Sequence, residues 1–148
     1  MKKVVLNYLV IAAIAVSAAF VSSCGSSLKS TVGNFLYPEN LLVGVWEGSY
    51  MANMGETGIT LTVYKEGANF KATCDFYSLP GKTNAQTGKY LMNVSYDEAK
   101  KTYLLKAYEW VVHPSGYVYS DLEGTISGNV FSGTLSSGRN LTFRVVKK

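Results

Sequence analysis

The sequence of 148 residues is poor in the side chains that bind metals and carry out acid–base catalysis, because it contains one histidine and two cysteines. A metal site needs several histidine, cysteine or carboxylate ligands close together, and no C-x-x-C or H-E-x-x-H spacing occurs in the chain. The histidine, His113, precedes Pro114 in a segment typical of a turn. We therefore expect no metal, no cofactor and no enzymatic activity.

Charged residues are also scarce, at 16% of the chain. Basic residues never form a run longer than two, which argues against nucleic-acid binding. Asp121 and Glu123 lie two residues apart, a spacing that suits a carboxylate pair for acid–base chemistry. The alternation of Val118, Leu122 and Ile126 with polar residues favours a different interpretation, in which both carboxylates lie on the solvent side of a strand.

The N-terminus carries the longest apolar run. Lys2 and Lys3 precede residues 4–20, which are largely apolar, and small residues continue to Cys24. This layout is typical of a secretory signal peptide. A transmembrane anchor is the alternative, but the apolar run is interrupted and no basic cluster follows it.

Residues 21–24, Val-Ser-Ser-Cys, resemble the lipobox of bacterial lipoproteins. The resemblance implies cleavage before Cys24 and acylation of that cysteine, with palmitate or similar chains, and such chains hold a protein on a membrane without a spanning helix. Gly25 follows in place of the aspartate of inner-membrane lipoproteins. The resemblance therefore implies an outer-membrane lipoprotein of a Gram-negative envelope, facing the periplasm rather than the cell surface.

We expect three regions: a signal peptide over residues 1–23, a lipidated tether over residues 24–40, and a domain over residues 41–148. With Cys24 lipidated, Cys74 has no partner for an intrachain disulfide. Cys74 alternates with Phe70, Ala72 and Phe76, so we expect a buried thiol rather than a reactive one.

The domain consists of short segments in which apolar and polar side chains alternate, separated by turn residues. This pattern predicts β-strands, and no helical period appears. Short antiparallel connections join nearly all the segments. The expected strands cover residues 41–50, 59–64, 70–77, 89–96, 102–112, 117–127, 130–136 and 141–148.

An open meander of about eight strands would leave two long edges exposed. Closing the sheet into a barrel removes both edges and leaves an interior that side chains fill or that holds one small ligand. We therefore predict an all-β protein with an antiparallel up-and-down barrel. A two-sheet β-sandwich of the same strands is the alternative.

Gly44, Val45 and Trp46 are similar to the G-x-W motif near the start of lipocalins and other calycins, which include avidin-like barrels. The resemblance implies a lipocalin-like barrel. In those families a basic residue of the last strand often packs over the tryptophan, and Arg144 is the candidate in this chain. The motif indicates a fold and names no ligand.

Aromatic side chains concentrate in the second half of the domain, where they form either core packing or a binding surface. As a binding surface, they suit a cavity at the mouth of a barrel or a contact with a protein. The candidate contacts are Tyr90, Tyr108, Trp110, Ser115, Tyr117 and Tyr119. We expect a non-enzymatic protein that binds a small apolar ligand.

Residues 115–119, Ser-Gly-Tyr-Val-Tyr, match the S-G-x-x-Y motif of periplasmic lysozyme inhibitors. That resemblance implies that Ser115 enters the active cleft of a lysozyme. The alternative function is therefore a protein-binding module, such as an inhibitor of an envelope hydrolase or an envelope assembly factor.

Overall fold

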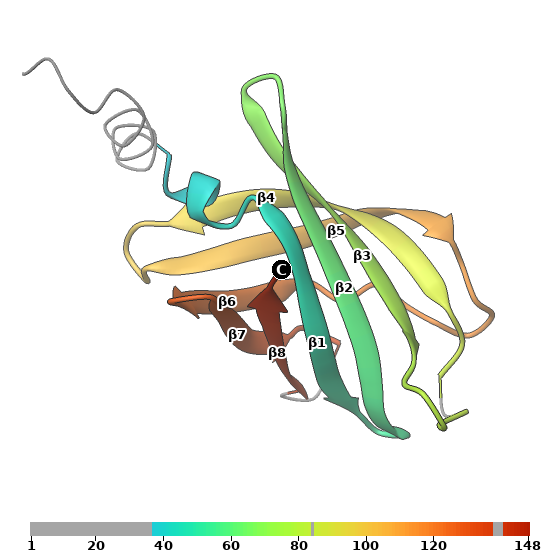
Figure 1. Cartoon of the computed structure of the whole chain (residues 1–148). Helices are drawn as coiled ribbons and strands as arrows, with labels where there is room; N and C mark the ends of the chain where they lie inside the picture. The colour runs from blue at the N-terminus through green and yellow to red at the C-terminus, as the bar shows by residue number, and fades with distance from the viewer. Residues whose placement is uncertain (1–36, 84, 138–140) are drawn as a thin grey trace, which may run out of the picture.

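The computed structural model describes residues 37–83, 85–137 and 141–148. Eight antiparallel strands follow one another around a closed barrel (Figure 1). A short 3-10 helix, η1 (Pro38–Leu41), precedes them. The strands are β1 (Gly44–Ala52), β2 (Gly55–Glu66), β3 (Asn69–Ser78), β4 (Gly88–Asp97), β5 (Thr102–Val112), β6 (Leu122–Ser127), β7 (Val130–Leu135) and β8 (Leu141–Lys147).

Pairing of the first strand with the last closes the barrel. Gly48 of β1 pairs with Val145 of β8, and Tyr50 pairs with Phe143. All other neighbouring strands are consecutive in the chain. The predicted up-and-down barrel is confirmed, and the β-sandwich alternative is excluded. The part of the chain described here contains no helix that is both long and apolar enough to cross a membrane.

Side chains alternate between the barrel interior and solvent, as the sequence predicts. On β3, Phe70, Ala72, Cys74 and Phe76 are buried, while the residues between them are more exposed. Cys74 is 1% exposed, which confirms the expected buried thiol. The other strands contribute to the same core the side chains of Trp46, Ile59, Leu61, Val63, Tyr90, Met92, Val94, Tyr103, Leu105, Leu122, Phe131, Leu135, Phe143 and Val145.

Helix η1 and Trp46 plug one end of the barrel. The indole Nε1 of Trp46 donates a hydrogen bond to the carbonyl oxygen of Leu42, at 2.7 Å, and both residues are buried. The Tyr103 hydroxyl donates to the carbonyl oxygen of Pro38, at 3.0 Å. Residues 37–40, which we expected in the tether, thus pack against the barrel.

A basic residue does lie over Trp46, but it is Lys147. Its Nζ is 5.1 Å from the centroid of the Trp46 ring and donates a hydrogen bond to a carbonyl oxygen of η1, at 3.0 Å. Arg144, the expected residue, is exposed. The expectation was wrong because Arg144 stands between the buried Phe143 and Val145, and neighbouring residues of a strand point to opposite faces.

A β-bulge in β5 changes which side chains face the interior. Ala107 pairs with Met92, and Trp110 pairs with Tyr90, so one residue of β4 lies opposite two of β5. A bulge of this kind redirects the side chains that follow it. Tyr108 is exposed, as alternation after the buried Leu105 requires, whereas the extra residue turns Trp110 inward, where its ring packs against Tyr90.

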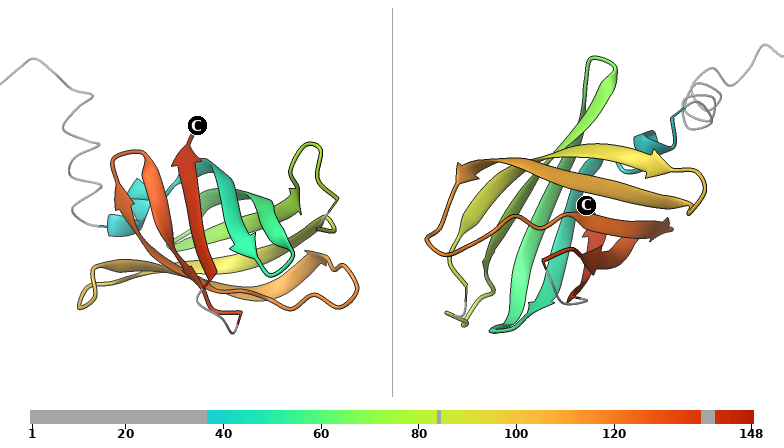
Figure 2. Two further views of the ribbon diagram at one scale, coloured as in Figure 1. Left: turned by 90° about the horizontal axis from the view of Figure 1, so that it is seen from below. Right: turned by 180° about the vertical axis from the view of Figure 1, so that it is seen from behind.

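Strands β5 and β6 pair over three residues only, from Tyr103 to Leu105. Beyond Leu105, β5 continues to Val112 without a paired strand on that side. The chain then returns along residues 113–121, a connection without strand pairing (Figure 2).

The expected strand over residues 117–127 is wrong in its first five residues, because β6 begins at Leu122. Side chains take the place of ladder hydrogen bonds in the preceding segment. The Asp121 Oδ1 accepts a hydrogen bond from the Ala107 backbone N–H, at 2.9 Å. The hydroxyl of Ser136 accepts a hydrogen bond from the Asp121 backbone N–H, also at 2.9 Å. Alternation of apolar residues alone did not reveal this difference.

Candidate ligand cavity

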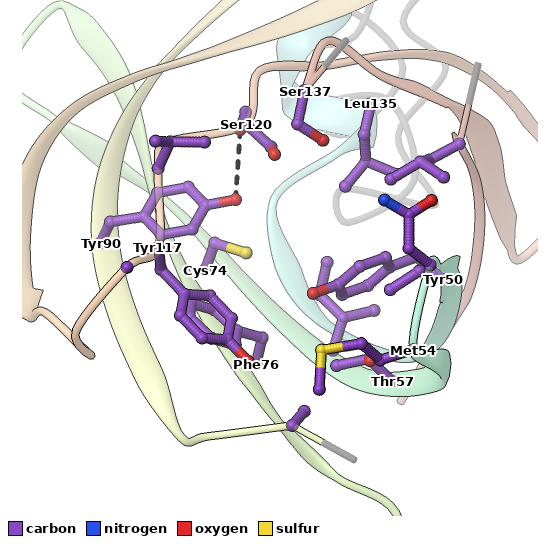
Figure 3. Close-up of a pocket in the computed structure, with 17 residues that line it drawn as sticks. Tyr50, Met54, Thr57, Cys74, Phe76, Tyr90, Tyr117, Ser120, Leu135 and Ser137 are labelled. Atoms are coloured by element: carbon purple, nitrogen blue, oxygen red, sulfur yellow. Dashed lines mark hydrogen bonds between the residues drawn. The ribbon is translucent and has the colours of Figure 1, made fainter. Parts of the chain in front are cut away.

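A cavity of about 300 Å³ lies at the end of the barrel opposite η1 (Figure 3). Turns between β1 and β2, β3 and β4, β5 and β6, and β7 and β8 surround it. The barrel is therefore plugged at one end and hollow at the other. The lining residues are Tyr50, Ala52, Asn53, Met54, Thr57, Ile59, Cys74, Phe76, Ala85, Tyr90, Gly116, Tyr117, Val118, Ser120, Leu135, Ser137 and Leu141.

One wall of the cavity is aromatic. Phe76 and Tyr117 stack with their ring centroids 5.2 Å apart, and Tyr90 lies 6.3 Å from Phe76. Tyr117 belongs to the β5–β6 connection and is fixed by its polar groups: its hydroxyl accepts a hydrogen bond from the Gln86 backbone N–H, at 3.1 Å. Its carbonyl oxygen lies 3.0 Å from the Nε2 of His113. The result is a broad apolar face built from three separate parts of the chain.

Trp110 supports this wall from behind. Its ring meets Tyr90 edge to face at 5.3 Å and stacks on Tyr119 at 4.9 Å and on His113 at 4.5 Å. Contacts of these types favour fixed ring orientations. Trp110 and Tyr119 therefore hold the lining rings in place without facing the cavity themselves.

The opposite wall carries Tyr50 and Thr57, with Met54 at the β1–β2 turn (Figure 3). Tyr50 points inward because it follows Trp46 by four residues on β1, where every second side chain shares a face. Burial raises the pKa of Tyr50 to about 12, against a smaller opposing effect of the neighbouring Thr57 hydroxyl. Thr57 is itself 1% exposed.

The remaining deep polar groups are also neutral. The Tyr90 hydroxyl donates a hydrogen bond to the carbonyl oxygen of Ser120, at 3.1 Å, and burial raises its pKa well above the usual value. Burial likewise raises the pKa of the Cys74 thiol to about 12. None of the described lining residues is an acid, a lysine, an arginine or a histidine. The lining residues that the structure describes thus offer hydroxyl and thiol groups and no ionised side chain at neutral pH.

Four of the residues singled out in the sequence are brought together by the structure. Tyr90 and Tyr117 line the cavity, and Trp110 and Tyr119 form the layer behind them. The aromatic concentration in the second half of the domain therefore marks one wall of a cavity and its support.

Two others lie elsewhere. Tyr108 points outward because it follows the inward-facing Ala107, and the Nζ of Lys71 is 4.7 Å from its ring centroid. Ser115 is exposed in the turn after β5. Cys24, the expected lipidation site, lies outside the described residues.

Asp121 and Glu123 do not form a carboxylate pair in the cavity. Asp121 receives the Ala107 N–H, as described above, and Glu123 accepts hydrogen bonds from Lys100 and Thr102, at 3.2 and 3.1 Å. Both carboxylates fix the β5–β6 region, and neither lines the cavity.

The sequence analysis missed the wall formed by Tyr50, Met54 and Thr57. Residues 53–58 have the composition of a turn, yet β2 already begins at Gly55 and carries Thr57 inward. The inward direction of Tyr50 could have been predicted, because it lies an even number of residues after Trp46 on the same strand. The inward direction of Thr57 could not, because the turn between β1 and β2 is shorter than the composition of residues 53–58 indicates.

Within residues 37–83, 85–137 and 141–148, no three histidine, cysteine or acidic side chains come together as a metal site. Comparisons with protein-family models, with curated proteins and with solved structures found no match.

Proposed function

We propose that this protein is a lipid-anchored envelope lipoprotein whose barrel binds a small apolar ligand in the cavity opposite η1. The observation that carries the proposal is the hollow end of an otherwise filled barrel. Its volume of about 300 Å³ lies at the lower end of the range typical of small-molecule sites. The N-terminal resemblance to lipoproteins supports the anchor and the envelope location.

The construction of the cavity supports binding rather than catalysis. A mostly apolar lining with a few convergent polar groups is typical of ligand sites. The aromatic wall of Phe76, Tyr90 and Tyr117 supplies apolar contact area, and its support by Trp110 keeps that area ordered in the absence of a ligand. An ordered site loses little conformational entropy on binding.

Native mass spectrometry of the full chain, extracted from its own envelope, tests the proposal. We expect a retained small molecule on the wild-type protein. Ala52→Phe should abolish it, because Ala52 lines the cavity and a phenyl ring there would occupy the space. Denatured spectra of the same samples should show acyl chains on a polypeptide that begins at Cys24.

The matched control is Ala99→Phe. Ala99 is exposed in the β4–β5 turn, at the plugged end of the barrel, so this variant should retain the ligand. Loss of the small molecule from both variants, or its absence from the wild type, would contradict the binding function. An unacylated Cys24 would contradict the anchor and leave the cavity argument unchanged.

A protein partner is the second candidate, favoured by exposed apolar side chains at the hollow end. Met54 and Val118 are 71% and 72% exposed, and Val111 and Val112 are about half exposed. Exposed apolar groups that cluster around one site often mark a contact surface. In the same spectra, a stoichiometric protein without a small molecule would support this function.

A further inference from the structure

The chemistry of the cavity lining restricts the ligand further, an inference that rests on the proposed binding function. We propose that the cavity selects an uncharged, compact molecule that presents a hydrogen-bond acceptor to the Tyr50–Thr57 hydroxyl pair. The features that carry the inference are the neutral lining, the hydrogen bonds already made inside it, and the arrangement of the two walls.

An anion would find no charged partner among the described lining residues. Burying an unpaired carboxylate or sulfonate is costly, because no counter-charge replaces the lost hydration. Lys82, in the β3–β4 turn, is held by Glu56 at 3.1 Å and is not among the described lining residues. Simple fatty acids in their ionised form therefore fit the lining poorly.

A cation fits no better. Aromatic rings attract cations, but a carboxylate is needed to offset the desolvation of a buried charge. The carboxylate of Asp121 already accepts the Ala107 N–H at 2.9 Å and is not among the described lining residues. Uncharged ligands remain.

The hydroxyl groups of the two walls differ in what they can still donate. The Tyr90 hydrogen is committed to the Ser120 carbonyl oxygen, at 3.1 Å. The Thr57 hydroxyl lies near that of Tyr50 and lowers its pKa. The two groups hold two hydroxyl hydrogens, and a hydrogen bond between them would use one. The other acceptor near this pair, the Gly55 carbonyl oxygen, is 3.5 Å from the Thr57 Oγ1, which is long for a hydrogen bond between oxygens.

One hydrogen of the Tyr50–Thr57 pair is thus available for a ligand. Figure 3 shows this pair facing Phe76, Tyr90 and Tyr117 across the cavity. A flat apolar body against the aromatic wall would direct a ketone, ester or ether oxygen toward the pair. The Cys74 thiol, in the same space, is a much weaker donor.

Four probes with one naphthalene skeleton separate these requirements: 2-ethylnaphthalene, 2-acetylnaphthalene, 2-naphthoate and protonated 2-(aminomethyl)naphthalene. The full-length protein is held in nanodiscs, and binding at pH 7 is measured by equilibrium dialysis with mass-spectrometric quantification. Discs with the Ala52→Phe variant give the lipid background to be subtracted.

We expect the ketone to bind most tightly, and both ions to bind at least about thirtyfold more weakly, because a buried charge without a partner is strongly disfavoured. Tyr50→Phe should weaken the ketone about fivefold, the effect of one lost hydrogen bond, and leave the hydrocarbon unchanged. Equal hydrocarbon affinity also shows that the variant is folded.

Each other outcome has a distinct meaning. An ion that binds as tightly as the ketone overturns the selection for uncharged ligands. A ketone that gains nothing over the hydrocarbon, or loses nothing in Tyr50→Phe, overturns the role of the hydroxyl pair. Failure of all four probes to bind above background contradicts the proposed binding function itself.

Discussion

Cys74 shows how position on a strand decides the chemistry of a residue. Its thiol lines the cavity but is 1% exposed, and burial raises its pKa to about 12 from a usual 9.0. The thiolate is the reactive form. A cysteine that would react readily on a loop is therefore expected to be inert here, although a cavity lies beside it.

We predict that native Cys74 reacts with a thiol-specific disulfide reagent at pH 8 about a thousandfold more slowly than in the unfolded chain, because its thiolate population falls by the same factor. Absorbance of the released thiol, followed with and without denaturant, measures both rates. Cys74→Ser supplies the background. Comparable rates in the two states would show that the thiol is accessible and ionised.

Among the elements, β5 has the largest effect on the site. Its bulge turns Trp110 toward the inner side, although Tyr108, only two residues earlier, points outward. Without the extra residue, strict alternation would put both on one face. The aromatic wall therefore depends on irregular pairing in one strand, whose register with β4 shifts on both sides of Trp110.

Trp110→Ala should lower the free energy of unfolding by about 3 kcal/mol, the usual cost of removing a large packed ring. Tyr108→Ala should change it by less than about 1 kcal/mol, because an exposed ring loses little on truncation. Urea unfolding followed by circular dichroism measures both. Similar losses in the two variants would mean that the bulge does not separate inner from outer side chains.

Strand β5 also shows which features of the fold can be predicted from the sequence alone and which cannot. Alternation is a local property, so the inward faces of β3 and β8 and the burial of Cys74 were predictable from the order of residues. A bulge depends on the partner strand, and the end of pairing after Leu105 depends on the path of the returning chain. The inward turn of Trp110 and the loss of strand over residues 117–121 had no local signal.

For the whole molecule, closure and core packing matter more than surface charge. The five ion pairs found among the described residues have side chains that are at least one-third exposed, and exposed pairs of this kind contribute little. Closure requires β1 and β8 to approach closely at Gly48. A methyl group there would overlap the Arg144 carbonyl oxygen and lie 2.8 Å from the Val145 Cα.

We predict that Gly48→Ala destabilises the barrel by about 2 kcal/mol or more, because the added carbon meets backbone that cannot move independently. Denaturant unfolding measures the loss. Thr142→Ala, an exposed change on the same last strand, should alter stability by less than about 0.5 kcal/mol. An unchanged midpoint for Gly48→Ala would show that β1 and β8 are less tightly joined than the structure indicates.

The pairing of β1 with β8 also sets an order of events during synthesis. Strand β1 emerges first and can pair with β2 at once, but its other edge stays open until β8 has been released, about a hundred residues later at the spacing given by the register. Throughout that interval the nascent sheet has two free edges, which are sites for wrong pairing with other chains. Chaperones that shield strand edges would thus act on this protein before its final strand arrives, and proteases would act on copies that never receive it.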